Sequence, residues 1–472
     1  MRVLHEQLRE VSNWSWVSFQ DNRKMPFESE RHTLYMYIHD THTQCIKDKS
    51  VQALAQSTKA FSKLKVSSSP MTSPLLLVGW ALAALPAPAA SQCLSRNDHK
   101  FLTKDPDLFP LAPFSLGIFR ELAPPEGNFV LSPFSVWSAL VVAYFGSGGS
   151  TEMQLRRTLL LNGKENALAL YKCVVEIYAS QATKPNNTFS AASRIYVQEG
   201  SPLKACVRGA LKEELDAIDF QQPDLAAATI NAFVSRASRG KIPQAVTSPD
   251  LGGARAVLVN AAHFEGVWEE PFLPENTRTE IFFASRGRQL QVDMMTQRNL
   301  FKLGSSQDLG ARVLEMAYRG GTASMFVFLP LGQQDLNQML LRLNPTTFLA
   351  AMTSTRAQEV DLSFPKFRVE TVMQRDLLTA LARMGINDLF TETSDLTTFF
   401  AGGGRHRLDW ALHTAALEVD ERGASSAAIA GASSAPVSTQ EPVPFRCDRP
   451  FVFLVYDKVN RNILFAGVFR LP

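Results

Sequence analysis

Between Glu418 and Ala432 the chain reads Glu-Val-Asp-Glu-Arg-Gly-Ala-Ser-Ser-Ala-Ala-Ile-Ala-Gly-Ala, a strand pattern that breaks at Gly423 into small, weakly polar residues. Burial of such a segment gains little free energy, so we expect an exposed loop here. The stretch from Glu418 to Ala435 nevertheless lacks proline, and nothing in it is bulky enough to prevent it from forming a strand. We therefore predict a solvated loop that is able to join a β-sheet.

The rest of the chain shows helical patterns early and strand patterns late. Ser132 before Pro133 predicts a helix start, and Gly146 to Gly149 predict its end. Two further segments have helical spacing and two apolar runs have strand length: Leu170 to Tyr178 and Ala226 to Val234 for the helices, Val257 to Val259 and Met325 to Leu329 for the strands. This order favours an α+β fold over a βαβ repeat.

Composition is that of an ordinary globular protein, with 45% hydrophobic and 20% charged residues. The formal net charge of +3 is too small to indicate binding to nucleic acid or to an anionic membrane. No basic stripe with interleaved aromatic residues is found either. We therefore expect no nucleic-acid partner and no stable membrane association.

Several motifs follow one another in a fixed order, and together with the small-residue loop they resemble the serpin family of serine protease inhibitors. They are Asn128 to Ser135, Phe145 to Thr151, Leu258 to Trp268, Val313 to Tyr318, Ser324 to Pro330, Phe364 to Phe367, Asp448 to Phe451 and Ile463 to Gly467. The resemblance covers roughly Phe109 to Pro472 and is closest in appearance to the plasminogen activator inhibitor and protease nexin branch. It implies an α+β serpin fold with about three β-sheets, about eight or nine helices, and an exposed reactive-centre loop over about 421–446.

The resemblance also implies a mechanism, that of a suicide-substrate inhibitor of an extracellular serine protease. The protease cuts the loop, the loop inserts into the central sheet, and the acyl-enzyme is trapped. Residues at alternate positions of an inserted strand must fit the core, and here they are small and uncharged. The hinge residues that we assign are Glu421, Gly423, Ala424, Ser426, Ala428 and Ala430. The family often has threonine where Ala424 and Ala430 stand, and Ile429 is bulkier than usual.

Two positions for the reactive bond remain open. The family's usual loop length, counted from Glu421, places it at Val437–Ser438, whereas counting back from Asp448 places it near Thr439–Gln440. No arginine or lysine lies between Gly423 and Phe445, so a trypsin-like specificity pocket would find no cation to bind. Val437 after Pro436 suits a small apolar pocket, and we expect an elastase-like target.

Further positions match family sites that control sheet opening. Ser132, Ser135, Asn260 and His413 match the shutter, a buried hydrogen-bond cluster, and Trp268 and Phe272 match the breach, where the loop first enters the sheet. The motifs of common enzyme classes are missing, so we expect neither catalysis nor a cofactor nor a metal site. The alternative to inhibition is a non-inhibitory serpin that acts as a hydrophobic-ligand carrier, chaperone or scaffold. In either case we expect a monomer.

The N-terminal region is unusual because an apolar run follows Met71 rather than the first residue. Residues 71–90 have an apolar stretch and a small-residue end, as in a secretory signal, and are too short to span a bilayer. Either translation starts at Met71 or residues 1–70 form an extension of the signal. We divide the chain into the extension (1–70), the signal-like segment (71–90) and a single domain (91–472), and expect a secreted protein.

The cysteines that follow this segment are widely and irregularly spaced. We expect Cys93, Cys173, Cys206 and Cys447 to be mostly unpaired, with Cys173 and Cys206 buried on helices; a bridge is the alternative. Asn186-Asn187-Thr188 is an acceptor sequon in a polar loop. Export would make Asn186 a glycosylation site.

Overall fold

The computed structural model describes residues 106–472, apart from 182–186, 285–286, 333–334, 402–405 and 425–440. The predicted extension (1–70), signal-like segment (71–90) and Cys93 lie outside the described residues. Within the described part, the nine α-helices are α5 (Ala112–Leu122), α6 (Pro133–Gly146), α7 (Gly149–Thr158), α8 (Lys164–Gln181), α9 (Ala205–Ala210), α10 (Pro223–Ala237), α11 (Leu336–Arg342), α12 (Pro345–Thr353) and α13 (Arg375–Arg383). Short 3-10 helices are η3 (Phe109–Leu111), η4 (Ser248–Leu251) and η5 (Pro274–Asn276).

A six-stranded sheet contains the start of the predicted hinge. Its order is β10 (Phe367–Met373), β11 (Trp410–Val419), β4 (Ala256–Val267), β2 (Asn187–Gln198) and β3 (Leu215–Ile218), with β12 (Gly423–Ala424) paired to β4. The two long central strands, β11 and β4, run parallel to each other. Strand β12 is the next strand after β11 in the chain.

A nine-stranded sheet forms the rest of the β structure. Its order is β1 (Phe129–Leu131), β15 (Asn462–Phe469), β14 (Phe451–Asp457), β8 (Ala323–Pro330), β7 (Ala311–Ala317), β6 (Gln289–Ser306), β9 (Arg356–Pro365) and β13 (Val443–Arg446), with β5 (Arg278–Phe283) paired to β6. Strand β6 pairs with β5 and β9 through its first part and with β7 through its last. Hydrogen bonds along this long strand thus join two of the three expected sheets into one. Helices and two β-sheets together form the α+β architecture predicted from the sequence.

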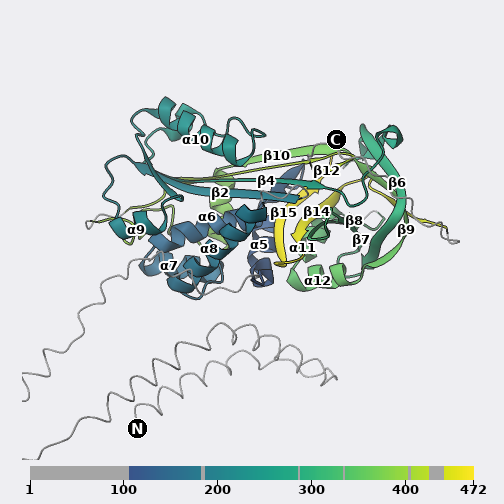
Figure 1. Cartoon of the computed structure of the whole chain (residues 1–472), viewed down its shortest axis with the longest axis horizontal. Coiled ribbons are helices and arrows are strands. Elements are labelled where there is room, and N and C mark those ends of the chain that lie inside the picture. Colours follow the sequence, from purple (N-terminus) through teal and green to yellow (C-terminus); the bar gives the residue numbers. More distant parts are fainter. Residues whose placement is uncertain (1–105, 182–186, 285–286, 333–334, 402–405, 425–440) are drawn as a thin grey trace, which may run out of the picture. The chain divides into compact units, whose positions relative to one another are not determined.

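The helices cover the two faces of the six-stranded sheet separately. In Figure 1, α10 lies on one side of β2 and β4, and α6 and α8 lie on the other. Side chains of β4 alternate accordingly: Leu258 packs in the main core with α6, whereas Val257 and Val259 pack in a smaller cluster with α10. The sheet is therefore a middle layer whose strands are buried on both sides.

Helix α6 begins as predicted, with Ser132 as N-cap and Pro133 at its first position. The Ser132 side chain accepts a hydrogen bond from the Ser135 N–H, which satisfies one donor of the first turn. Every residue of α6 is buried, because its side chains are apolar nearly all round. The helix ends at Gly146, where an added Cβ would lie 2.2 Å from the Phe399 ring. The predicted helices at Leu170 to Tyr178 and Ala226 to Val234, and both predicted strands, are also present.

The cysteine prediction was partly wrong. Cys173 on α8 and Cys206 on α9 are only half-buried, because Tyr171, Val174 and Tyr178 take the buried face of α8. Cys447 is a buried free thiol, whereas Cys206 is disulfide-bonded. Burial raises the pKa of the Cys447 thiol well above 9. None of the helices in the described part of the chain is long and apolar enough to cross a bilayer.

Candidate functional site

The candidate site is the place where β4 and β11 separate. The two strands pair from Val257 with Trp410 to His263 with Ala416, and no further. Beyond this point β12 takes the place beside β4, with Gly423 opposite Val267 and Ala424 opposite Gly266. The start of the predicted hinge is therefore already a short antiparallel strand of the six-stranded sheet.

A tight turn folds β12 back from the end of β11. The Asp420 N–H donates to the Gly423 carbonyl at 2.9 Å, and the Gly423 N–H donates to the Asp420 carbonyl at 3.2 Å. The Asp420 side chain accepts from the N–H groups of Arg422 and Gly423 at 2.9 and 3.0 Å. Gly423 has a φ of +144°, and a Cβ there would lie 1.9 Å from the Gly266 carbonyl oxygen. Only glycine fits this position without moving β12 away from β4.

Trp268 and Phe272, assigned to the breach from the sequence, both hold this turn through their backbones. The N–H groups of Trp268 and Phe272 each donate at 2.8 Å, to the carbonyls of Arg422 and Glu421 respectively. The indole N–H of Trp268 donates to the Asp420 carbonyl at 3.1 Å, and its ring stacks on Tyr318 at a centroid distance of 4.5 Å. The indole is 1% exposed, so it forms a rigid floor under the hinge.

Glu421 anchors the other side of the turn. Its carboxylate accepts a hydrogen bond from the Thr277 hydroxyl at 2.9 Å and pairs with the Lys366 ammonium at 3.0 Å. Burial alone would raise the pKa of Glu421, but hydrogen bonds from its own backbone, Lys366 and Thr277 lower it below its usual value. The sequence indicated Glu421 but neither of these partners, which lie far away along the chain.

The four residues assigned to the shutter come together in one buried cluster. The Ser132 N–H donates to His413 Nε2 at 3.2 Å, and His413 Nδ1 bonds to Asn260 Oδ1. Asn260 Oδ1 also accepts from the Ser135 hydroxyl at 2.8 Å. The Asn260 amide donates to the Ser193 hydroxyl at 2.9 Å, and the Ser132 hydroxyl donates to the Leu464 carbonyl at 2.7 Å. The cluster connects β4, β11, β2, α6 and β15.

His413 is neutral in this cluster. Burial lowers its pKa to about 3. The geometry agrees, because a proton on Nε2 would point at the N–H of Ser132, and two donors cannot bond to each other. The cluster is therefore satisfied only with His413 unprotonated, and its proton sits on Nδ1 facing Asn260. Opening β4 from β11 would separate His413 from Asn260.

A loop after α10, residues 238–242, contacts both β4 and β11 near the point where these two strands separate. We call it the bridging loop. Arg239 pairs with Glu265 on β4, and Lys241 pairs with Glu418 on β11 at 2.9 Å. The Lys241 carbonyl also accepts a hydrogen bond from Arg368 on β10 at 3.0 Å. Sequence reasoning missed this loop because its partners are distant along the chain, as Lys241 and Glu418 are 177 positions apart.

The predicted reactive bond lies in the part of the loop that is not described. Val437, Ser438, Thr439, Gln440 and the hinge residues Ser426, Ala428 and Ala430 all fall outside the described residues, as does Asn186. Where the chain is described again, β13 runs parallel to β9 in the nine-stranded sheet, and Arg446 pairs with Glu280 on β5 at 2.6 Å. The loop thus connects one sheet to the other, with a strand at each end.

Comparisons of sequence and of structure with known proteins find the same family. The family model Serpin (serine protease inhibitor) matches residues 111–472. Serine protease inhibitor 88Ea of Drosophila melanogaster is 31% identical over 425 residues, covering 83% of this chain and 97% of that protein. The leukocyte elastase inhibitor of Bos taurus is 31% identical over 373 residues, covering 76% and 97%. The crystal structure of native protease nexin-1 with heparin has a TM-score of 0.68 and 26% identity, covering 77% of this chain and 100% of that one.

Proposed function

This chain belongs to the serpin (serine protease inhibitor) family, and on that premise we propose that it inhibits a serine protease as a suicide substrate. The protease cleaves the loop near Val437–Ser438, with Thr439–Gln440 as the alternative bond. The loop then enters the six-stranded sheet between β4 and β11 and carries the acyl-enzyme with it. One observation carries this proposal: β12 is already paired to β4 at the point where β4 and β11 part.

The register of β12 indicates which loop residues would face the core on insertion. Because Ala424 lies opposite Gly266, continued antiparallel pairing places Ser426 opposite Phe264 and Ala428 opposite Ala262. Phe264 and Ala262 belong to the main core, so the side chains beside them must be small and uncharged. Both loop residues meet this requirement, which supports inhibition over the non-inhibitory alternative known in this family.

The distance that the cut end would travel is large. Insertion of about fifteen residues at about 3.3 Å each moves that end by about 50 Å. A protease bound there as an acyl-enzyme would be carried the length of the sheet and distorted before water could release it. The inserted strand would gain hydrogen bonds from both β4 and β11, whose pairing it interrupts.

The target class and location are also proposals. We propose an elastase-like protease, because the loop offers Val437 and no cation, and relatives of this chain include a leukocyte elastase inhibitor. Secretion rests on the signal-like residues 71–90, glycosylation rests on the Asn186 sequon, and the monomeric state is expected from the family. Likeness to the protease nexin-1 structure agrees with the branch expected from the sequence, and that assignment stays a prediction.

Two neighbouring substitutions test the insertion step. Ser426→Arg would place a charge against Phe264 in the core, whereas Ser425→Arg would face the carboxylate of Glu265. An elastase-like protease should cut both variants at the same bond, as read by mass spectrometry. We expect a large rise in melting temperature and a covalent complex for the wild type and Ser425→Arg only, because burying the unpaired charge of Ser426→Arg costs several kcal/mol.

The melting temperature of the cleaved wild type decides between the two functions. If cleavage of the wild type leaves it unchanged, the loop does not insert, and a carrier, chaperone or scaffold becomes the better account. If Ser426→Arg still forms the complex, the register proposed here is wrong even though insertion takes place.

A further inference from the structure

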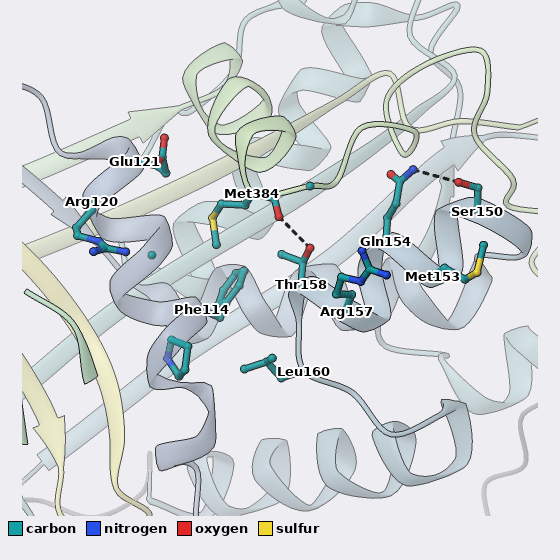
Figure 2. A pocket seen from close by; sticks show the side chains of 13 residues that line it. Phe114, Arg120, Glu121, Ser150, Met153, Gln154, Arg157, Thr158, Leu160 and Met384 are labelled. Carbon is teal, nitrogen blue, oxygen red and sulfur yellow. Dashed lines mark hydrogen bonds between the residues drawn. The ribbon is translucent and has the colours of Figure 1, made fainter. Parts of the chain in front are cut away.

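A cavity lies away from the hinge, between α5, α7 and the turn after α13 (Figure 2). Its volume is about 580 Å³, within the range of about 300–1,000 Å³ that is usual for small-molecule sites. Phe114 of α5, Leu160 after α7 and Met384 after α13 form an apolar floor. The proposed inhibitory mechanism uses none of these residues.

The cavity carries positive charge that no neighbour neutralises. Arg120 of α5 and Arg157 of α7 line it, and neither side chain makes a hydrogen bond or an ion pair with another residue in the described part of the chain. The acidic residue in the lining, Glu121, pairs instead with Arg383 at 3.6 Å. The two exposed guanidinium groups therefore remain available to an anion, and arginine typically binds carboxylates in a bidentate manner.

The other polar groups of the lining are already used within the protein. The Thr158 hydroxyl donates to the Met384 carbonyl at 3.1 Å, and the Gln154 amide donates to the Ser150 hydroxyl at 3.1 Å (Figure 2). The Gln154 carbonyl oxygen accepts from two backbone N–H groups, those of Asn387 and Asp388. A ligand in this cavity would thus find apolar surface and arginine, with few other polar groups to bind.

Leu160 is an unusual residue for its place at the end of α7. Its φ of +59° puts it in the left-handed region, and the Leu161 N–H donates back to the Arg156 carbonyl at 2.9 Å. A helix that ends in this way ordinarily has glycine or asparagine at such a position, because a side chain strains the backbone. The leucine is nevertheless 47% exposed and lines the cavity. Strained backbone positions cluster at functional sites, which makes Leu160 a candidate for a functional role.

We propose that this cavity binds an amphipathic anion, a molecule with a long apolar part and a carboxylate or sulfate headgroup, such as a free fatty acid. The apolar part lies on Phe114, Leu160 and Met384, and the headgroup pairs with Arg157. Arg157 is chosen because Figure 2 shows it beside Thr158 and Gln154, at the polar end of the cavity. Arg120, on the α5 side, adds a more distant positive charge.

The first test is a calorimetric titration of the full-length protein with sodium oleate below its micelle concentration. We expect saturable binding of one oleate per chain and much weaker binding of the neutral analogue oleyl alcohol. Arg157→Gln should weaken oleate binding about tenfold, since the charge-assisted hydrogen bonds are lost. Arg156→Gln is the matched control, because Arg156 is the preceding residue of α7 and does not line the cavity; it should bind like the wild type.

The second test uses Leu160→Gly, which separates a ligand contact from a structural role. Glycine relieves the backbone strain, so the melting temperature without ligand should not fall, whereas oleate affinity should fall several-fold. The proposal is overturned if Leu160→Gly or Arg157→Gln binds oleate like the wild type, or if oleyl alcohol binds as tightly as oleate. Binding to phosphatidylserine vesicles without binding of free oleate would also overturn it, in favour of a membrane surface.

Discussion

At the scale of single residues, the site depends on groups that have one acceptable state. His413 must be neutral, since its two nitrogens face an N–H and a carbonyl oxygen. Gly423 must be glycine, since a Cβ would collide with β4. The small residues of the hinge and the four polar residues of the cluster could be selected from the sequence, because they lie in recognisable motifs. Lys366 and Thr277 could not, since an ion pair or a hydrogen bond between distant residues leaves no local pattern.

The protonation of His413 predicts how stability depends on pH. Its pKa is about 3 in the folded protein and about 6.5 in the unfolded chain, so between these two pH values the unfolded chain takes up the proton and the folded protein does not. Stability is therefore complete above about pH 6.5 and falls as the pH is lowered, by about 2 kcal/mol at pH 5. Urea unfolding at pH 8 and pH 5 should show this loss.

His413→Gln should remove the part of this loss that His413 contributes, about 2 kcal/mol at pH 5. Burial also lowers the pKa of His263, and its contribution should remain. His406→Gln serves as the comparison, as burial also lowers the pKa of His406 but this residue is only half-buried. If the wild type and His413→Gln lose the same stability between pH 8 and pH 5, then His413 does not titrate as proposed and the loss comes from other groups such as His263.

At the scale of secondary structure, two separate sets of contacts hold β4 and β11 together. The His413 cluster holds β4 to β11 from within, and the bridging loop holds both strands from outside through Arg239 and Lys241. The strands themselves were predictable from continuous apolar runs. The pairing of β6 with three strands, β5, β9 and β7, was not predictable from the sequence. The burial of β6 alternates irregularly along its length and so shows no simple period.

Lys241→Glu should speed loop insertion. The substitution replaces the pair with Glu418 by a repulsion, which is worth about 1 kcal/mol for partly exposed charges and corresponds to about fivefold in rate. Stopped-flow tryptophan fluorescence after mixing with the protease would measure the rate. Lys302→Glu is the control, because its partner Glu315 lies on β7 in the other sheet. Equal rates for Lys241→Glu and the wild type would mean that the bridging loop does not restrain the strands.

At the scale of the whole molecule, the loop connects two sheets and its two ends are held independently. Residues before it lie in β12 against β4, and residues after it lie in β13 against β9. The family resemblance predicted an exposed loop over about 421–446, but not which sheet holds each of its ends. The cavity beside α5 and α7 was not predictable, since it is formed by three elements that are distant along the chain and share no motif.

The position of the reactive bond can be determined by introducing an arginine at each candidate position and measuring inhibition of trypsin. Val437→Arg should convert the protein into an inhibitor of trypsin if Val437–Ser438 is the bond, because the new cation pairs with the carboxylate of the trypsin pocket. We expect the rate of complex formation with trypsin to rise about thirtyfold or more. Thr439→Arg should have this effect instead if the bond is Thr439–Gln440. Gel analysis of the covalent complex and mass spectrometry of the released peptide give the answer.

The pairing of Gly423 and Ala424 with β4 has a kinetic consequence. In most strand additions the slow part is the search, because a free segment must lose its conformational entropy before the first hydrogen bonds form. Here the first two residues have completed that search while the loop is still whole. Once the loop is cut, insertion is the elongation of an existing nucleus, one residue after another, in a register that is already set. Loop insertion competes with hydrolysis of the acyl-enzyme, and the existing pairing of Gly423 and Ala424 favours insertion in this competition.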